Sequence, residues 1–148
     1  MRVLVDTSVL VRLREQDNPL RWVCEQSIRQ LRQQQHEMCL CTQMLIEFWS
    51  VATRPVEANG LGMSPEQAFE DCERFLRLAT FLPEPEDIFD RWLHIVRQYA
   101  VKGKQVHNAR LVAVAQAYGV GQILILNAQN FARYPEVSAL LPQQIVAG

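Results

Sequence analysis

The chain has 148 residues, of which 49% are hydrophobic. This length suits one compact domain over residues 1–148, with a core that needs neither disulfides nor a structural metal. The formal net charge of −1 means that overall charge does not indicate a nucleic-acid or membrane partner.

The charges are nevertheless distributed unevenly along the chain. Between Glu57 and Asp90 there are nine acidic residues and only two basic ones, whereas from Arg97 onward there are five basic residues and one acidic residue. We therefore expect the C-terminal third to present a basic face.

The cysteines and the N-terminus bear on the compartment. The four cysteines lack the C-x-x-C spacing of metal and redox sites, which favours buried, reduced thiols over a zinc site. Reduced cysteines are typical of cytoplasmic proteins. The apolar stretch before Asp6 is too short for a signal peptide, and no apolar run reaches membrane-spanning length. We therefore expect a cytoplasmic protein without a membrane partner.

The first half of the chain alternates strand and helix patterns. An apolar strand over residues 2–5 ends at Asp6. The segment 18–32 opens on an Asn-Pro pair, which suits a helix cap and first turn, and repeats apolar residues at helical spacing. A buried strand is expected over 38–41, followed by a helix over 42–53 that Thr42 can cap.

The second half continues this alternation. A Ser-Pro-Glu-Gln capping box at residues 64–67 opens a helix with its acids on one side. The patterns predict a helix over 64–79, a short strand over 80–82, a helix over 87–101, a buried helix over 107–118 with Gly119 at its C-cap, and a central strand over 123–126. Buried strands alternating with helices predict an α/β fold, with a central, mainly parallel sheet flanked by helices on both faces.

Asp6 is the most informative polar residue, because it stands where the first strand ends. The strand ends of an open parallel sheet meet at one crevice, where a carboxylate can hold a metal or a substrate proton. The residues Thr7 and Ser8 that follow also allow Asp6 to cap the next helix. The sequence leaves both interpretations open.

Three further polar residues have alternatives of the same kind. Glu47 is flanked by Ile46 and Phe48, which favours a partly buried carboxylate with a partner over an exposed one. Asn108 can be a ligand or a helix cap. Arg110 can contact a substrate or pair with a surface acid.

Four segments together resemble PIN domains, especially the bacterial VapC-type toxin ribonucleases. Residues 5–10 (VDTSVL) are similar to the first family motif, and residues 45–49 (LIEFW) to the helical glutamate. Residues 106–113 (VHNARLVA) are similar to the third motif, and residues 124–131 (LILNAQNF) to the segment after the last central strand. The resemblance covers essentially the whole chain and implies a single PIN-like domain.

The resemblance implies a divalent-metal site for cutting RNA. Asp6, Glu47 and Asn108 would hold Mg²⁺ or Mn²⁺ near an RNA phosphate, where the metal activates water. The catalytic set would be Asp6, Glu47, Asn108 and Asn130. This chain departs from the family where it has Asn108 and Asn130 in place of acids and Ile125 in place of threonine. An amide oxygen ligates without charge, so metal binding is expected to be weaker.

The resemblance also implies partners. It assigns RNA contacts to Ser8, Lys102, Lys104 and Arg110, and it implies a homodimer and a cognate antitoxin protein. Two functions remain open at this stage. The first is a metal-dependent endoribonuclease, and the second is a catalytically weakened PIN domain that binds RNA or a protein. A non-PIN α/β protein whose polar residues only cap helices is a third hypothesis.

Overall fold

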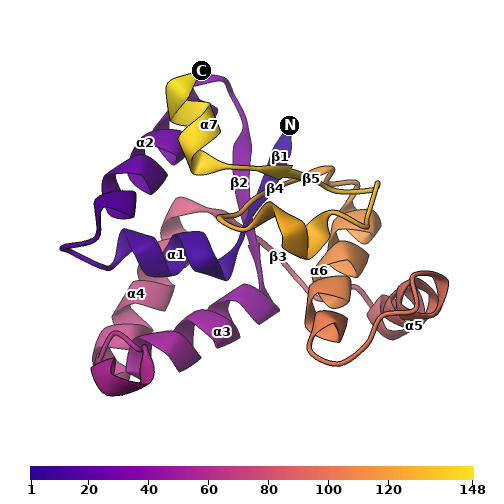
Figure 1. The fold of residues 1–148 in the computed structure, drawn as a ribbon, viewed down its shortest axis with the longest axis horizontal. Coiled ribbons are helices and arrows are strands. Elements are labelled where there is room, and N and C mark those ends of the chain that lie inside the picture. Colours follow the sequence, from indigo (N-terminus) through magenta and orange to yellow (C-terminus); the bar gives the residue numbers. More distant parts are fainter.

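The computed structural model describes residues 1–148 and has a central sheet with helices on both faces (Figure 1). The sheet has five strands in the order β3-β2-β1-β4-β5, and every neighbouring pair is parallel. The strands are β1 (Arg2–Val5), β2 (Glu37–Cys41), β3 (Thr80–Leu82), β4 (Gln122–Leu124) and β5 (Ser138–Leu140). The predicted α/β fold class is confirmed.

Seven helices connect and cover these strands. They are α1 (Thr7–Leu13), α2 (Pro19–Gln33), α3 (Thr42–Thr53), α4 (Pro65–Leu78), α5 (Ile88–Gln98), α6 (Gln105–Tyr118) and α7 (Pro142–Ala147). In Figure 1 the helices α1 to α4 lie on one side of the sheet, and α5 and α6 lie on the other. The connections from β1 to β2, from β2 to β3 and from β3 to β4 each run through two of these helices, as parallel strands require, whereas a 3₁₀ turn over Ala128–Phe131 joins β4 to β5.

The core forms where the central strands meet this helical cover. Val3, Leu4 and Val5 of β1 are all buried, as are Met38 to Cys41 of β2. Such continuous apolar runs are typical of parallel strands that are covered on both faces. Phe48 of α3 is fully buried, and its ring meets that of Phe75 edge to face at 5.0 Å between centroids. This contact joins α3 to α4 on the side of the sheet that also carries α1 and α2.

The predicted helix signals mostly perform as expected. Ser64 and Gln67 form the reciprocal capping box, with backbone-to-side-chain distances of 3.1 and 2.9 Å. Asn18 caps α2 by accepting from the Leu20 amide at 2.9 Å. Gly119 ends α6 with a φ of 66°, which suits a residue without a Cβ atom. The predicted cap at Thr42 is wrong, because β2 runs directly into α3 and Cys41 is the cap residue, without a side-chain bond.

The remaining differences concern element ends and exposure. The strand predicted over 123–126 ends at Leu124, and the short elements β5 and α7 were not predicted. All four cysteines are free thiols, and burial raises the pKa of Cys24 to about 11. Trp22 on α2 is 59% exposed. No helix has both the length and the apolar character needed to span a membrane.

Candidate active site

Asp6 lies at the junction between β1 and α1. Its backbone N–H donates to the Leu124 carbonyl at 2.9 Å, which fixes it beside the end of β4. Its Oδ2 atom accepts from the Ser8 amide at 3.0 Å, so Asp6 is the N-cap of α1. The cap bond uses one carboxylate oxygen and leaves Oδ1 available. Both interpretations of Asp6 from the sequence are therefore compatible with its position.

The environment of Asp6 is unusual for a carboxylate. Burial raises the pKa of Asp6 above its ordinary value, while hydrogen bonds from Ser8 and Thr7 act in the opposite direction. Burial penalises the charged form because the low-dielectric surroundings replace water. A carboxylate in this state gains from a nearby cation, which offsets that penalty.

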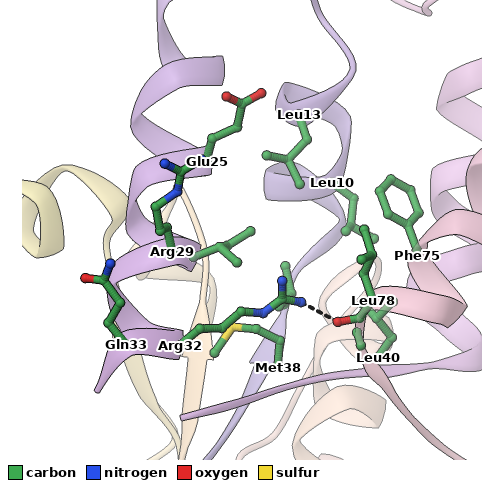
Figure 2. Close-up of a pocket in the computed structure, with 13 residues that line it drawn as sticks. Leu10, Leu13, Glu25, Arg29, Arg32, Gln33, Met38, Leu40, Phe75 and Leu78 are labelled. Atoms are coloured by element: carbon green, nitrogen blue, oxygen red, sulfur yellow. Dashed lines mark hydrogen bonds between the residues drawn. The ribbon is translucent and has the colours of Figure 1, made fainter. Parts of the chain in front are cut away.

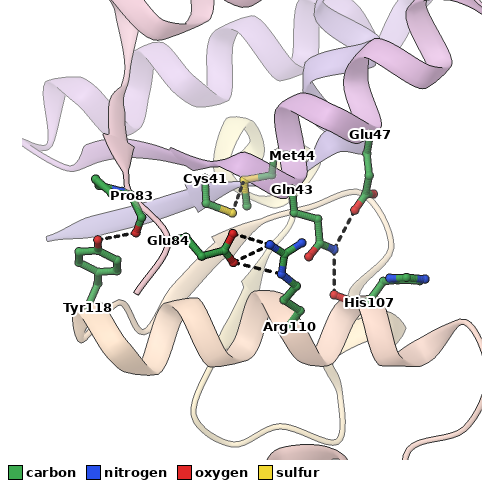
Figure 3. Close-up of polar contacts among 9 residues, drawn as sticks. All are labelled: Cys41, Gln43, Met44, Glu47, Pro83, Glu84, His107, Arg110 and Tyr118. Atoms are coloured by element: carbon green, nitrogen blue, oxygen red, sulfur yellow. Dashed lines mark hydrogen bonds and ion pairs between the residues drawn. The ribbon is translucent and has the colours of Figure 1, made fainter. Parts of the chain in front are cut away.

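Glu47 lies in the second turn of α3 and is partly buried, as predicted. Its Oε1 atom accepts from Nε2 of Gln43 at 2.8 Å, and the same Nε2 donates to the His107 carbonyl at 2.8 Å. Figure 3 shows Gln43 placed between Glu47 and the first turn of α6. The expected partner of Glu47 is thus an amide rather than a cation.

Hydrogen bonds join the starts of three helices at the carboxyl edge of the sheet. Thr7 Oγ1 donates to the Met44 carbonyl at 3.4 Å and links α1 to α3. Gln43 links α3 to α6. The Leu126 amide donates to Ser8 Oγ at 3.4 Å and ties the segment after β4 to α1. Asp6, Glu47 and Asn108 therefore stand on elements that are bonded to one another at a single edge.

Asn108 is partly buried in the first turn of α6 and does not cap that helix, because Lys104 is the cap residue. Its Nδ2 atom donates to Gln105 Oε1 at 3.1 Å. This bond uses a donor of the amide and leaves the amide oxygen available. Asn108 directly follows His107, whose carbonyl accepts from Gln43. Because Gln43 also donates to Glu47, the same side chain links the neighbourhoods of Asn108 and Glu47.

The fourth segment places two asparagines near the end of β4. Asn127 accepts from the Gln129 amide at 3.1 Å and caps the 3₁₀ turn over Ala128–Phe131, which contains the partly buried Asn130. Asn130 was predicted from the sequence as a catalytic residue, whereas Asn127 was not. The signal for Asn127 was its position three residues beyond the end of β4, since ligands bind outside the carboxyl ends of strands.

The basic residues at this edge differ in their contacts. Arg110 forms an ion pair with Glu84, with Nη2 to Oε2 at 2.5 Å and Nε to Oε1 at 3.2 Å (Figure 3). The alternative of a surface ion pair is therefore the one that the structure shows. Lys102 and Lys104 are exposed in the segment that leads into α6. Glu84 was not singled out from the sequence, because nothing local marks its contact with Arg110.

The donor set can be tested against the implied metal. No group of three or more His, Cys, Asp or Glu side chains is arranged to hold a metal ion. The edge supplies the carboxylates of Asp6 and Glu47 and the amide of Asn108, which are all hard oxygen donors. Mg²⁺ and Mn²⁺ prefer such donors. The residues fit these ions in chemical type, with less negative charge than three acids would give.

A separate groove lies between α1, α2, α4 and β2 (Figure 2). It has a volume of about 530 Å³, and its lining is mostly apolar, with Leu10, Ile28 and Phe75 among the contributors. Arg32 crosses it by donating to the Leu78 carbonyl. Neither Asp6, Glu47 nor Asn108 lines this groove, so it is distinct from the polar edge.

A protein-family model tests the resemblance of the four segments to PIN domains. The model described as the PIN domain matches residues 3–137. The chain is a member of the PIN domain family. The match includes Asp6, Glu47, Asn108 and Asn130, so all four segments that carried the resemblance lie inside it.

Solved structures support the same fold for this PIN domain. A VapBC2 complex from Rickettsia felis, bound to a promoter DNA fragment, gives a TM-score of 0.71 at 12% identity, covering 95% of this chain and 98% of the other. DNA-bound VapBC from Salmonella typhimurium gives 0.71 at 14% identity, covering 96% and 98%. VapC20 from Mycobacterium tuberculosis, a toxin that cleaves the sarcin-ricin loop, gives 0.65 at 15% identity, covering 89% and 95%.

At these identities the likeness demonstrates a shared fold. No curated protein sequence is significantly similar to this PIN domain. The family and the fold predicted from the sequence are confirmed, whereas the metal ligands and the RNA contacts stay predictions.

Proposed function

We propose that this PIN domain is a divalent-metal-dependent endoribonuclease of the VapC type, which hydrolyses RNA phosphodiester bonds. The observation that carries the proposal is the position of Asp6 and Glu47 on helix starts that are hydrogen-bonded together at the carboxyl edge of the sheet. One protein of similar fold is a toxin that cleaves the sarcin-ricin loop, which supports RNA as the substrate class.

In this proposal Asp6, Glu47 and Asn108 hold Mg²⁺ or Mn²⁺, and Asn130 completes the catalytic set. When bound, such an ion activates water and offsets the charge that develops on the phosphate. The protein supplies the partly buried Asp6 carboxylate, whose raised pKa reflects desolvation that a cation relieves. It also supplies a Glu47 carboxylate that Gln43 holds in place.

Four residues are proposed to guide the RNA backbone. Lys102 and Lys104 are exposed next to the start of α6 and can approach phosphates as mobile point charges. Arg110 can do so when it leaves Glu84, because an exposed ion pair contributes only about 0–1 kcal/mol. Ser8 is the second residue of α1, and its amide donates to Asp6, which places it close to the proposed metal site.

A second candidate function is a PIN domain that binds RNA or a protein without cutting. Asn108 and the absence of a three-acid group favour it. At ~4 Å and an effective dielectric near ~20, one missing carboxylate forfeits several kcal/mol of gross attraction to a divalent ion. Part of that loss returns as lower desolvation cost. A net loss of only ~1.4 kcal/mol already weakens metal binding tenfold.

Cleavage of a structured RNA with Mg²⁺ or Mn²⁺, together with calorimetric Mn²⁺ binding, tests the proposal. Asp6→Ala is expected to abolish cleavage and to weaken Mn²⁺ binding by more than tenfold, because it removes a ligand and a helix cap at once. Asn18→Ala is the matched control, since it removes the cap of α2 and a bond to Glu15 without touching a proposed ligand, and the lost cap costs a similar ~1 kcal/mol of stability.

The two functions predict different results in this experiment. The control should cleave like the wild type, which shows that losing a cap does not explain the effect of Asp6→Ala. A wild-type protein that binds RNA but shows neither Mn²⁺ binding nor cleavage would replace the nuclease with the binding module.

Two protein partners belong to the proposal. Structures of similar fold include VapBC complexes, which supports a small antitoxin encoded beside this chain. Its apolar helix face would pack in the groove of Figure 2, and its acids would face Arg29. Co-purification of such a protein with this chain tests the antitoxin.

A homodimer is proposed through exposed Ile46 and Trp49 on α3, and sedimentation as a monomer at micromolar concentration would contradict it.

A further inference from the structure

Gln43 occupies an uncommon position in the first turn of α3. Its side chain is buried, with 7% of the residue exposed. Its amide nitrogen donates both protons, one to Glu47 Oε1 and one to the His107 carbonyl, each at 2.8 Å. In Figure 3 the amide stands between these two acceptors. The Gln43 side chain thus connects the proposed ligand Glu47 to α6, the helix that carries the proposed ligand Asn108.

The orientation of this amide follows from its partners. A reversed amide would turn its oxygen toward the Glu47 carboxylate and the His107 carbonyl, which are both acceptors. The observed orientation leaves Gln43 Oε1 buried without a hydrogen-bond partner. A buried, unpaired carbonyl costs free energy. The two N–H bonds therefore decide the orientation, and the oxygen remains unsatisfied as a result.

These two bonds restrict the site in two ways. The bond to Oε1 fixes the Glu47 carboxylate, whose long side chain otherwise has many rotamers. It leaves Oε2 available to bind the metal ion. The bond to the carbonyl of His107, the residue before Asn108, fixes the distance between α3 and the first turn of α6. Ligands that are positioned before the metal arrives bind it more tightly.

We propose that Gln43 is a positioning residue, which holds Glu47 and the first turn of α6 in the arrangement that binds the divalent ion. This inference rests on the proposed nuclease function and adds a residue that was not predicted from the sequence. A purely structural glutamine would have its buried polar atoms paired, whereas Gln43 keeps one unpaired and uses both N–H groups on the site. Departures from full pairing are expected at functional sites.

The first test replaces Gln43 by methionine, which has a similar volume and no donor. Gln43→Met is expected to weaken Mn²⁺ binding about tenfold, equivalent to about 1.4 kcal/mol, while the thermal unfolding midpoint changes little. Stability changes little because the variant also removes the unpaired oxygen, and the two acceptors lie on the partly exposed Glu47 and the exposed His107, where water can replace the lost bonds. Ser27→Ala is the matched control, since it removes a fully buried hydrogen bond, to the Cys24 carbonyl, that lies on α2. It should leave Mn²⁺ binding unchanged.

A double-mutant cycle separates positioning from packing. If Gln43 acts partly through Glu47, then Gln43→Met should weaken Mn²⁺ binding more in the wild-type background than in the Glu47→Ala background, where only the bond to the His107 carbonyl remains. Equal Mn²⁺ affinity of Gln43→Met and the wild type would overturn the proposal. An equal further loss in both backgrounds would overturn it as well, because Gln43 would then act independently of Glu47.

A metal-free readout distinguishes failure of this inference from failure of the nuclease proposal. By nuclear magnetic resonance, both Nε2 protons of Gln43 should exchange with water at least tenfold more slowly than those of the exposed Gln33, and Glu47→Ala should remove the protection of one of them. Fast exchange in the wild type would contradict the positioning role even if the protein cleaves RNA. Slow exchange in a protein that binds no Mn²⁺ would reject both proposals, since the framework would exist without a metal to serve.

Discussion

The two halves of the candidate site lie at the same edge of the sheet and differ in chemistry. The half from β1, α1 and α3 presents the carboxylates of Asp6 and Glu47, whereas the half from α6 and the segment after β4 presents the amides of Asn108, Asn127 and Asn130. Both halves meet through Gln43 and through the bond between Leu126 and Ser8. The difference between them is therefore one of charge rather than of fold.

This comparison shows that packing and chemistry are specified by different residues. The amide-bearing half has its own buried core, formed by Leu111 to Ala115 of α6 and by Ile123 to Ile125, and Asn108 is not part of that core. Core positions preserve the scaffold, and only the few polar side chains at the strand ends decide what it can bind. A PIN fold can thus be retained while its metal affinity varies.

The largest effect is expected from giving the second half an acid. Asn108→Asp should tighten Mn²⁺ binding by at least tenfold, about 1.4 kcal/mol, and raise the cleavage rate, because it adds a charge where the structure has an amide in the first turn of α6. Calorimetric titration with Mn²⁺ measures the first quantity, and a gel-based RNA cleavage assay measures the second.

Two companion variants interpret that result. Asn59→Asp adds the same charge at an exposed position after α3 and should leave Mn²⁺ affinity unchanged. Asn130→Asp should give a smaller gain than Asn108→Asp, because Asn130 lies in the 3₁₀ turn rather than on a helix tied to Glu47. Unchanged affinity in both restored variants would show that missing charge does not limit this site.

The sequence predicted the fold well because fold signals are local. The apolar run over 2–5, the capping box at 64–67 and Gly119 each act within a few residues and appear where they were expected. The missed elements β5 and α7 have only three and six residues. Periodicity over such short segments is too weak to distinguish an element from a loop.

The details of the site could not be predicted in the same way. Gln43 bonds to a residue 64 positions away, and Arg110 pairs with Glu84 at a separation of 26. Such contacts arise only when the crossovers of the sheet bring separate helices together. The sequence could mark Asp6 and Glu47 through their motifs, but the contacts that hold Glu47 and occupy Arg110 depend on tertiary structure.

A smaller effect should follow from releasing Arg110 in the second half. Glu84→Gln removes the charge of the bidentate partner, so Arg110 becomes free to contact a phosphate. Affinity for single-stranded RNA should rise a few-fold, and the salt dependence should steepen by about 0.7 in log K against log salt, the value for one added contact. Fluorescence anisotropy at several salt concentrations measures both.

The control for this prediction is an equivalent pair at another place on the sheet. Glu37 starts β2 and pairs with Arg2 at 3.3 Å, with similar exposure of the two side chains. Glu37→Gln makes the same change in net charge, so it should alter RNA affinity only slightly. If both variants raise affinity equally, net charge rather than the release of Arg110 accounts for the effect.

The smallest effect concerns the carboxylate half and its dependence on pH. Burial raises the pKa of Asp6 above the unfolded value of 3.8, so the folded state binds this proton more tightly than the unfolded state. The contribution of the protonated Asp6 to folding stability is complete below pH 3.8 and is lost as the pH rises through the raised folded pKa. Asp6→Asn keeps the helix cap without the charge. The metal-free variant should therefore be more stable than the wild type at neutral pH.

Urea unfolding at a series of pH values measures this difference in free energy of unfolding. The advantage of Asp6→Asn should grow as the pH rises above 3.8 and should shrink when Mn²⁺ is added, because the cation stabilises only the charged wild-type residue. Asp17→Asn, at an exposed position, is the control for the same change in net charge. A pH-independent difference between Asp6→Asn and the wild type would mean that burial does not raise the pKa of Asp6. The carboxylate half would then lack the desolvated charge that distinguishes it from the amide half.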